Sequence, residues 1–395
     1  MKKQYRSHGD PNWSGVFAMS LCVFALIASE FMPVSLLTPI AADLRVSDGM
    51  VGKGIAISGA FAVLTSLSIS RLAGDMNRKT LLLALTALMA VSGAVVALAP
   101  SYLIYMVGRA LIGMVIGGFW SMSAATAMRL VPPDQVPRAL AIFNGGNALA
   151  TVIAAPLGAW LGAILGWRGA FFCLVPVAAV ALVWQWISLP DMAAQKRAPG
   201  SSNVFKVLAS PPVALGMAAC GAFFMGQFAL FTYVRPFLET VTIVNVTTLS
   251  LILLAIGVAG VIGTALIGSV LKRSLYGTLI VIPVLMAVIA LTLIPFGARV
   301  AAVVALLALW GLMATSAPVG WWSWIADAMP RNAEAGGGLM VAVIQLAIAL
   351  GSTLGGLLFD STGYQGTFMA SAVVLLFAAF LAFLTSRSQA RASSR

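Results

Sequence analysis

Charged residues are scarce in this chain of 395 residues, since Lys, Arg, Asp and Glu together make up only 9% of it. Soluble domains carry about 25% charged residues because their surface must face water. Hydrophobic residues make up 61% of the chain, and the mean hydropathy is +1.02. These values exclude an ordinary water-soluble fold, and we expect lipid to surround most of the polypeptide.

Histidine and cysteine are also rare, with one histidine and three cysteines in the whole chain. Cys22, Cys173 and Cys220 are isolated in apolar runs and lack CxxC spacing, which excludes a disulfide framework or a cysteine metal site. The sequence contains no Walker A, HExxH or GxSxG motif. We therefore expect no enzymatic activity, no cofactor and no metal, so that transport energy would come from an ion or solute gradient, or from a partner.

The basic excess gives a formal net charge of +12, which raises the question of a nucleic-acid partner. The Lys and Arg residues lie in small clusters between apolar segments, where they act as topology signals, and they form no basic helix. With the N-terminus inside, seventeen of the 23 fall in cytoplasmic segments and five in external segments. We expect both termini in the cytoplasm, no nucleic-acid partner, and a first apolar segment that is retained because it is too long for a signal peptide.

About 20 apolar residues are needed to cross a bilayer as a helix. This window predicts an all-α membrane protein with twelve transmembrane helices in two six-helix bundles, at 13–40, 51–70, 80–99, 102–128, 139–165, 169–188, 213–236, 246–269, 277–296, 300–325, 337–359 and 367–386. The expected organisation is an N-terminal bundle at 1–187, a polar cytoplasmic linker at 188–212, a C-terminal bundle at 213–386, and a cytoplasmic tail at 387–395.

Short internal matches support a duplication of six helices. Residues 118–122 resemble residues 320–324 at an offset of 202, and residues 166–171 resemble residues 363–368 at an offset of 197. The nearly constant offset at equivalent places indicates a parallel repeat. Repeats of this kind place the substrate site near the bilayer midplane, between the two halves.

Glu30 is the only carboxylate well inside a predicted span. An ionisable group at membrane depth costs a few kcal/mol, so it normally faces a cavity or a partner. Apolar surroundings favour the protonated form of a carboxyl group, which suits a proton carrier or a substrate anchor. Arg109 lies at a similar depth in the fourth span, which allows an ion pair with Glu30. The alternatives are a packing role for Glu30 and a purely structural ion pair.

Aromatic and amide side chains within or near the spans predict a neutral aromatic or sugar-bearing solute, because rings offer stacking surfaces and amides offer paired donors and acceptors. For each residue, an interfacial or helix-packing role remains the alternative. The candidate substrate-binding residues are Phe119, Trp120, Asn144, Asn147, Gln227, Tyr233, Trp321 and Gln345.

The sequence resembles the major facilitator superfamily, and within it the drug:proton antiporter-1 group that includes carriers exporting purine ribonucleosides. The resemblance is carried by residues 30–40, 117–122, 128–133, 155–158, 166–168, 233–236, 318–321 and 341–346. By that resemblance, Asp75, Arg78 and Lys79 form a charged loop that gates the cytoplasmic side. Arg109 and Gly113 match an element implicated in proton coupling, and Pro156 matches the antiporter motif, although Ala155 stands where Gly is usual.

The resemblance implies a proton-coupled antiporter that exports small solutes, with purine ribonucleosides or their analogues first among them, by alternating access in the bacterial inner membrane. Sugar or drug efflux is the alternative within the same superfamily. A gradient-driven importer or passive facilitator is a competing class, and a membrane-embedded enzyme or non-transporting sensor is a further one. We expect the carrier to act as a monomer, with protons, lipid and a small-molecule substrate as its partners.

Overall fold

The computed structural model describes residues 11–74, 76–132, 135–192, 210–329 and 333–393. Within these ranges the regular structure is helical, without strands. The first half contains α1 (Trp13–Leu44), α2 (Asp48–Leu72), α3 (Arg78–Ala97), α4 (Tyr102–Leu130), α5 (Val136–Phe172) and α6 (Leu174–Ser188). The second half contains α8 (Pro211–Phe231), α9 (Val234–Thr240), α10 (Val246–Arg273), α11 (Leu275–Phe296), α12 (Val300–Ala328) and α13 (Ala333–Ser393).

Two of these helices bend sharply at a glycine. Gly166 in α5 has φ 71° and ψ 166°, and Gly363 in α13 has φ 72° and ψ −168°. Side chains disfavour this backbone region, so only glycine fits it readily. The two positions are 197 residues apart, and their matching conformations are what the internal repeat predicts.

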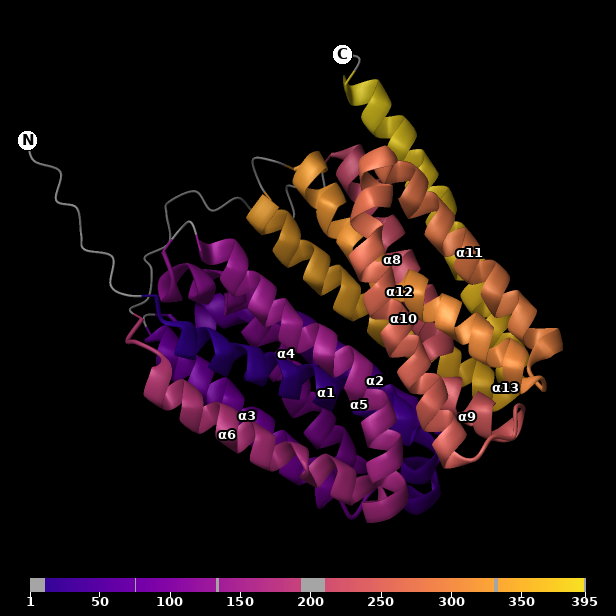
Figure 1. Cartoon of the computed structure of the whole chain (residues 1–395), viewed down its shortest axis with the longest axis horizontal. Helices are drawn as coiled ribbons and strands as arrows, with labels where there is room; N and C mark the ends of the chain where they lie inside the picture. The colour runs from indigo at the N-terminus through magenta and orange to yellow at the C-terminus, as the bar shows by residue number, and fades with distance from the viewer. Residues whose placement is uncertain (1–10, 75, 133–134, 193–209, 330–332, 394–395) are drawn as a thin grey trace, which may run out of the picture.

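The described residues contain ten helical segments long and apolar enough to cross a membrane. Two of these segments, of 51 and 55 residues, contain the bends at Gly166 and Gly363 and are each long enough for two crossings. Figure 1 shows the later part of α13 returning beside its earlier part toward the C-terminus. The all-α membrane fold is confirmed, and the ten segments have room for the twelve expected crossings.

One difference from the expected boundaries lies at the first span of the second half. The span expected at 213–236 ends at Phe231, and the short helix α9 follows after Tyr233. Pro236 lacks a backbone N–H and so cannot continue the hydrogen bonds of α8. Most of the expected linker lies outside the described residues, and α13 continues to Ser393 through the segment expected as a tail.

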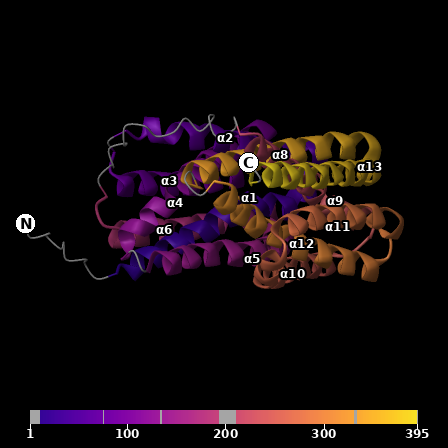
Figure 2. The same ribbon diagram turned by 90° about the horizontal axis from the view of Figure 1, so that it is seen from above.

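Each half has its own apolar core, and the halves meet along two pairs of helices. Val16, Met19 and Phe119 belong to a core built from the first half, whereas Phe223 and Met286 belong to a core built mainly from the second. Figure 2 shows α2 beside α13 and α5 beside α10 where the halves meet. The helices of the first half and those of the second form two groups (Figure 1), and the domain limits expected from the sequence remain predictions.

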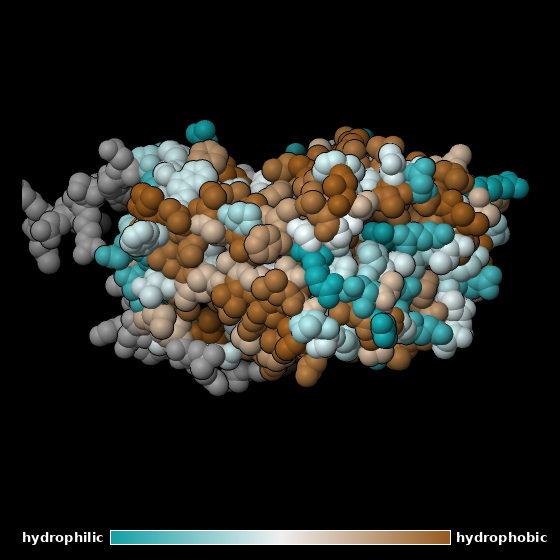
Figure 3. All heavy atoms as spheres, turned by 90° about the horizontal axis from the view of Figure 1, so that it is seen from below, coloured by the Kyte–Doolittle hydropathy of each residue, from teal (hydrophilic) through white to brown (hydrophobic). Residues whose placement is uncertain are grey.

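Large apolar side chains are exposed over much of the molecule. Trp186, Ile187 and Phe380 have exposed fractions of 65%, 76% and 55%. Figure 3 shows apolar patches on one face, interspersed with more polar residues. Soluble monomers rarely expose contiguous apolar patches of more than a few hundred Å². A surface of this kind is stable in contact with lipid hydrocarbon.

Glycines bring helix backbones into direct contact inside each half. A Cβ atom on Gly113 of α4 would lie 2.2 Å from the Ser58 carbonyl oxygen of α2. One on Gly311 of α12 would lie 2.2 Å from the Ile256 carbonyl oxygen of α10. Without a hydrophobic force between helices in lipid, close packing at small residues is the main source of association. These pairs occupy equivalent places in the two halves.

We predict that Gly113→Ala destabilises the protein, because the added methyl group collides with backbone and forces α4 away from α2. The expected loss is about 1–3 kcal/mol, measured by thermal unfolding in detergent. Gly268→Ala in α10 is the matched control, because its Cβ would meet nothing within 4 Å. Equal stability of the two variants would contradict the proposed tight contact.

Candidate functional site

Glu30 lies near the middle of α1 and is almost fully buried, with an exposed fraction of 5%. Its carboxyl group faces the second half of the molecule. The Nε2 atom of Gln345 in α13 donates a hydrogen bond of 3.3 Å to Glu30 Oε1. The side chain predicted to carry protons therefore joins the two halves, and its partner is a residue predicted to bind substrate.

Arg109 of α4 is 1% exposed and lies at the level of Glu30. Its guanidinium donates to the carbonyl oxygens of Ser29 (2.7 Å), Glu30 (3.3 Å) and Gly54 (3.2 Å). The ion pair expected between Arg109 and the Glu30 carboxylate is not formed, because the carboxyl group points toward α13 while the arginine is bound to backbone. Arg109 instead connects α4 to both α1 and α2.

A cavity lies between the halves, next to Glu30 along α1. Its empty space is about 630 Å³, part of which is open solvent. The first half contributes Phe31, Thr151 and Ala155. The second half contributes Gln227, Phe228, Phe231, Leu253, Ile256, Gly257, Trp310, Gly311, Ala314 and Thr315. None of these described lining residues is charged, so the cavity suits a neutral solute.

Aromatic rings from both halves meet at this cavity. Phe31 of α1 and Phe228 of α8 are stacked, with ring centroids 5.9 Å apart and planes inclined by 24°. Phe231 packs edge-on against Phe228 at 6.1 Å. Offset and edge-on ring contacts of this kind are favourable. A planar solute could add to this stack or separate the two rings.

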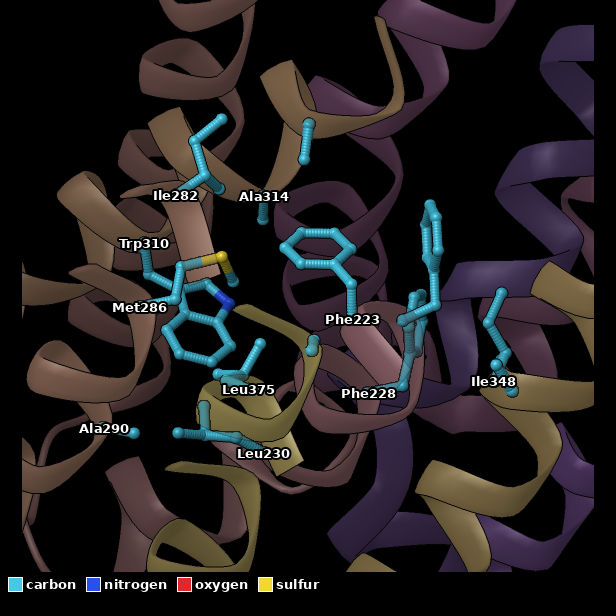
Figure 4. Packing of buried hydrophobic residues seen from close by; sticks show 14 of the residues in the cluster. Phe223, Phe228, Leu230, Ile282, Met286, Ala290, Trp310, Ala314, Ile348 and Leu375 are labelled. Atoms are coloured by element: carbon cyan, nitrogen blue, oxygen red, sulfur yellow. The ribbon is translucent and has the colours of Figure 1, made fainter. Parts of the chain in front are cut away.

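Two residues of the cavity wall keep a buried polar atom without a partner. These atoms are Oε1 of Gln227, an acceptor, and Nε1 of Trp310, a donor. Figure 4 shows Trp310 among the apolar side chains of the second half, close to Met286. Buried polar atoms are nearly always hydrogen-bonded, so these two atoms, an acceptor and a donor, are candidate ligand contacts.

The other predicted substrate residues lie elsewhere in this structure. Phe119 and Trp120 pack in the core of the first half, and Trp321 is buried in the second, edge-on to Trp324. Tyr233 is fully buried, and its hydroxyl donates to the Ser352 carbonyl at 2.7 Å. The Asn144 side chain lies outside the described part. Asn147 is half-buried in α5, and its carbonyl accepts from Thr151 at 2.9 Å.

The predicted gating residues are only partly described. Asp75 lies outside the described residues. Arg78 and Lys79 begin α3, where the Arg78 N–H donates to the Met192 carbonyl at 2.8 Å and the Lys79 N–H donates to Asn77 Oδ1 at 2.9 Å. Pro156 is buried in α5, close to the contact that Gly158 makes with Ser35 of α1. Their gating role remains a prediction.

The halves are tied together on the side where α1 ends and α2 begins, which we call the distal side. Asp360 of α13 accepts hydrogen bonds from the Ser47 hydroxyl at 2.5 Å and from the Gly49 N–H at 3.0 Å. Arg235 of α9 donates to the Ser35 carbonyl of α1 and forms an ion pair of 2.8 Å with Glu239. These contacts, together with the buried Val34, close the distal side.

Comparison with known proteins identifies the family to which this architecture belongs. The model of the Major Facilitator Superfamily matches residues 19–342. The chain belongs to this superfamily. The transporter is also similar in fold to a bacterial homologue of the human lysosomal transporter Spinster, crystallised in an inward-facing and unoccupied conformation. That likeness has a TM-score of 0.77 at 15% identity, over 97% of this chain and 98% of the other.

Two relatives of the transporter have curated names that describe different functions. It is 70% identical over 96% of each chain to the transcription regulatory protein OpdE of Pseudomonas aeruginosa. It is 40% identical, again over 96% of each chain, to the purine ribonucleoside efflux pump NepI of Salmonella enteritidis. The membership in a transporter family and the transporter homologues identify this chain as a non-enzymatic carrier.

Trp310 and Asp360 were not among the predicted site residues, although the sequence position of each indicates a role. Trp310 is the eleventh residue of α12, far from the membrane interfaces where tryptophan is enriched. Asp360 follows an apolar run that ends near the bend at Gly363, where an acidic residue can cap the start of another helix. The partner helix of Asp360 comes from the other half, which a local reading of the sequence does not reveal.

We predict that Asp360→Ala loosens the distal side, because α2 loses both the Ser47 and Gly49 contacts. The reporter is Val34→Cys in a background with the three native cysteines changed to Ala, since Val34 is 0% exposed behind this closure. A membrane-impermeant maleimide should label the reporter faster in the Asp360→Ala protein.

The matched control for this experiment is Asp43→Ala. It removes an acidic residue on the same side that pairs with Arg168 within the first half. Labelling should not change in this control. If Asp360→Ala also leaves labelling unchanged, Asp360 does not hold the halves together.

Proposed function

We propose that this transporter exports small neutral solutes from the cytoplasm in exchange for protons, by alternating access in the bacterial inner membrane. The observation that carries the proposal is the position of Glu30, buried where the halves meet and hydrogen-bonded across the junction by Gln345. A carboxyl group in that position is costly to ionise. Its proton therefore affects how firmly the halves are joined.

In the proposed cycle the distal side faces the cell exterior, as the distribution of Lys and Arg predicts. Glu30 takes up a proton while the distal side is open, and the protonated carrier closes that side as in this structure. Glu30 then releases its proton toward the cytoplasm, and a solute enters the cavity. The loaded carrier reopens the distal side and discharges the solute. Arg78, Lys79 and Pro156 are the proposed gating elements on the cytoplasmic route.

The leading substrates are purine ribonucleosides or their analogues. The NepI relative supports this assignment, and so does an uncharged cavity with stacked rings and two unpaired polar atoms. A nucleobase offers a flat apolar face together with donors and acceptors at its edge. Sugars lack the flat face, and cationic drugs would need a charge that the lining does not supply.

We predict that Glu30→Gln abolishes proton-driven export while solute binding persists. Glutamine keeps the size of the side chain but carries no exchangeable proton. Because Glu30 does not line the cavity, the binding free energy should stay within about 0.5 kcal/mol. In everted vesicles with an acidified lumen, added inosine should release protons from the lumen with the wild type and not with this variant. Normal pumping by Glu30→Gln would refute the carrier role.

We predict that Trp310→Phe weakens solute binding by about 1 kcal/mol, roughly fivefold in Kd, because it removes one hydrogen-bond donor and keeps an aromatic ring. Inosine binding to the purified protein is the measurement. Trp322→Phe is the matched control, because this exposed tryptophan of the same helix does not line the cavity. Equal weakening by the two variants would place the solute elsewhere.

A second candidate function is a membrane sensor that influences transcription, which the name of the OpdE relative favours. Transport and regulation are separable by one comparison. RNA abundance is measured in cells lacking the gene and complemented either with the wild type or with Glu30→Gln. Full restoration by the transport-deficient variant would favour a sensor. Restoration by the wild type alone would show that regulation follows from the exported solute.

A further inference from the structure

The side-chain amide of Gln345, at the junction of the halves, uses its donor but not its acceptor. Its side chain is 7% exposed, and its Nε2 donates to Glu30 Oε1 at 3.3 Å. Its Oε1 atom is buried and has no partner. Half of this carboxamide is therefore used in the structure, and the unused half is the acceptor.

The backbone of Gln345 is held in place by close packing. A Cβ atom on Gly59 of α2 would lie 2.7 Å from the Gln345 carbonyl oxygen, so α2 and α13 are in direct contact at this level. The amide group consequently stays beside Glu30 as long as the two helices remain packed. Side-chain rotation alone is enough to change which amide atom meets the carboxyl group.

Few charged groups can compete with Gln345 for the Glu30 carboxyl. Arg109 of α4 is the charged side chain acting on Glu30, and Tyr105 of the same helix acts on Arg109. Three of the five N–H donors of Arg109 are used on the carbonyls of Ser29, Glu30 and Gly54. From the second half, α13 contributes Gln345 and α8 contributes the uncharged ring of Phe228 beside Phe31.

The two protonation states of Glu30 use the amide differently. An ionised carboxylate only accepts hydrogen bonds, so it can use Nε2 and leaves Oε1 unpaired. A protonated carboxyl group can donate its O–H to Gln345 Oε1 and still accept from Nε2. The contact then gains a second hydrogen bond, and the buried negative charge disappears.

We propose that Gln345 is a positioning residue. Its hydrogen bonds to Glu30 depend on whether Glu30 is protonated, and they thereby control closure of the distal side. This inference rests on the proposed role of Glu30 as proton carrier. Protonation completes the amide pair and favours the joined halves of this structure. Loss of the proton leaves a buried carboxylate with one hydrogen bond, which favours separation. This dependence on the proton agrees with the proposed exchanger, in which the empty, protonated carrier returns to face the cytoplasm, where the solute is taken up.

The test measures distal opening against pH with the Val34→Cys reporter in the cysteine-free background. Ser361→Cys, which is exposed on the same side, corrects for the pH dependence of the thiol reaction. In the wild type we expect corrected labelling to fall about fivefold from about pH 8 to about pH 5, equivalent to the gain of one hydrogen bond. Gln345→Met, which has similar length but no amide, should label rapidly at both pH values.

Gln345→Glu keeps the shape of the side chain and guards against a packing artefact in the methionine variant. Two carboxyl groups in contact cannot both be ionised. This variant should therefore close at low pH, where a shared proton joins the pair, and open more widely than the wild type at high pH. A wild-type pH response in both Gln345 variants would overturn the inference.

Glu30→Gln separates failure of this inference from failure of the proposed function. Its side-chain amide can make the two hydrogen bonds of the protonated acid at any pH, so labelling should stay slow throughout. A persistent pH response in Glu30→Gln would refute Glu30 as the proton carrier. Loss of the response in Glu30→Gln together with its retention in Gln345→Met would refute only the role of Gln345.

Discussion

The binding of Arg109 to backbone carbonyls is the constraint on which the central region depends. A buried guanidinium offers five donors in a fixed plane, and it must satisfy them or lose more than it gains. Here it binds Ser29 and Glu30 of α1 and Gly54 of α2. Because Arg109 occupies the backbone side of Glu30, the carboxyl group remains available to the second half. An ion pair with Arg109 would have turned the Glu30 carboxyl group toward the first half.

Glycine contacts give the two halves rigidity and recur where the halves meet, and polar contacts there add to the packing. Inside the halves, Gly113 and Gly311 press helices backbone to backbone, and such contacts cannot open without loss of packing. Between the halves, Gly59 packs against the backbone of Gln345, and the side-chain contacts of Gln345, Asp360 and Arg235 each involve one or two hydrogen bonds. Contacts worth about 1 kcal/mol each can break and reform within a transport cycle. Rigid bundles joined in part by contacts of this kind suit rocking about a central site.

The sequence predicted the membrane fold well because hydropathy alone decides which segments are buried in lipid. The repeat was also visible, and the equal bends at Gly166 and Gly363 give it a structural basis. Site residues were harder to predict, because the sequence of an apolar helix does not show which way an aromatic side chain faces. Phe119 and Trp321 lie in the cores away from the cavity, whereas Trp310, which also belongs to a core, and Phe31 line the cavity wall. The choice depends on helix rotation within the bundle, which tertiary packing sets.

The proposed proton and solute sites occupy adjacent faces of one helix. Successive residues of an α-helix point about 100° apart, so Glu30 meets Gln345 of α13 while Phe31 meets Phe228 of α8. Glu30 is not in the cavity wall, and the wall is uncharged. Direct competition between proton and solute for one group is therefore unnecessary in the proposed cycle. A movement of α1 that loosens one contact must shift the other, and this shared helix is sufficient to couple the two sites.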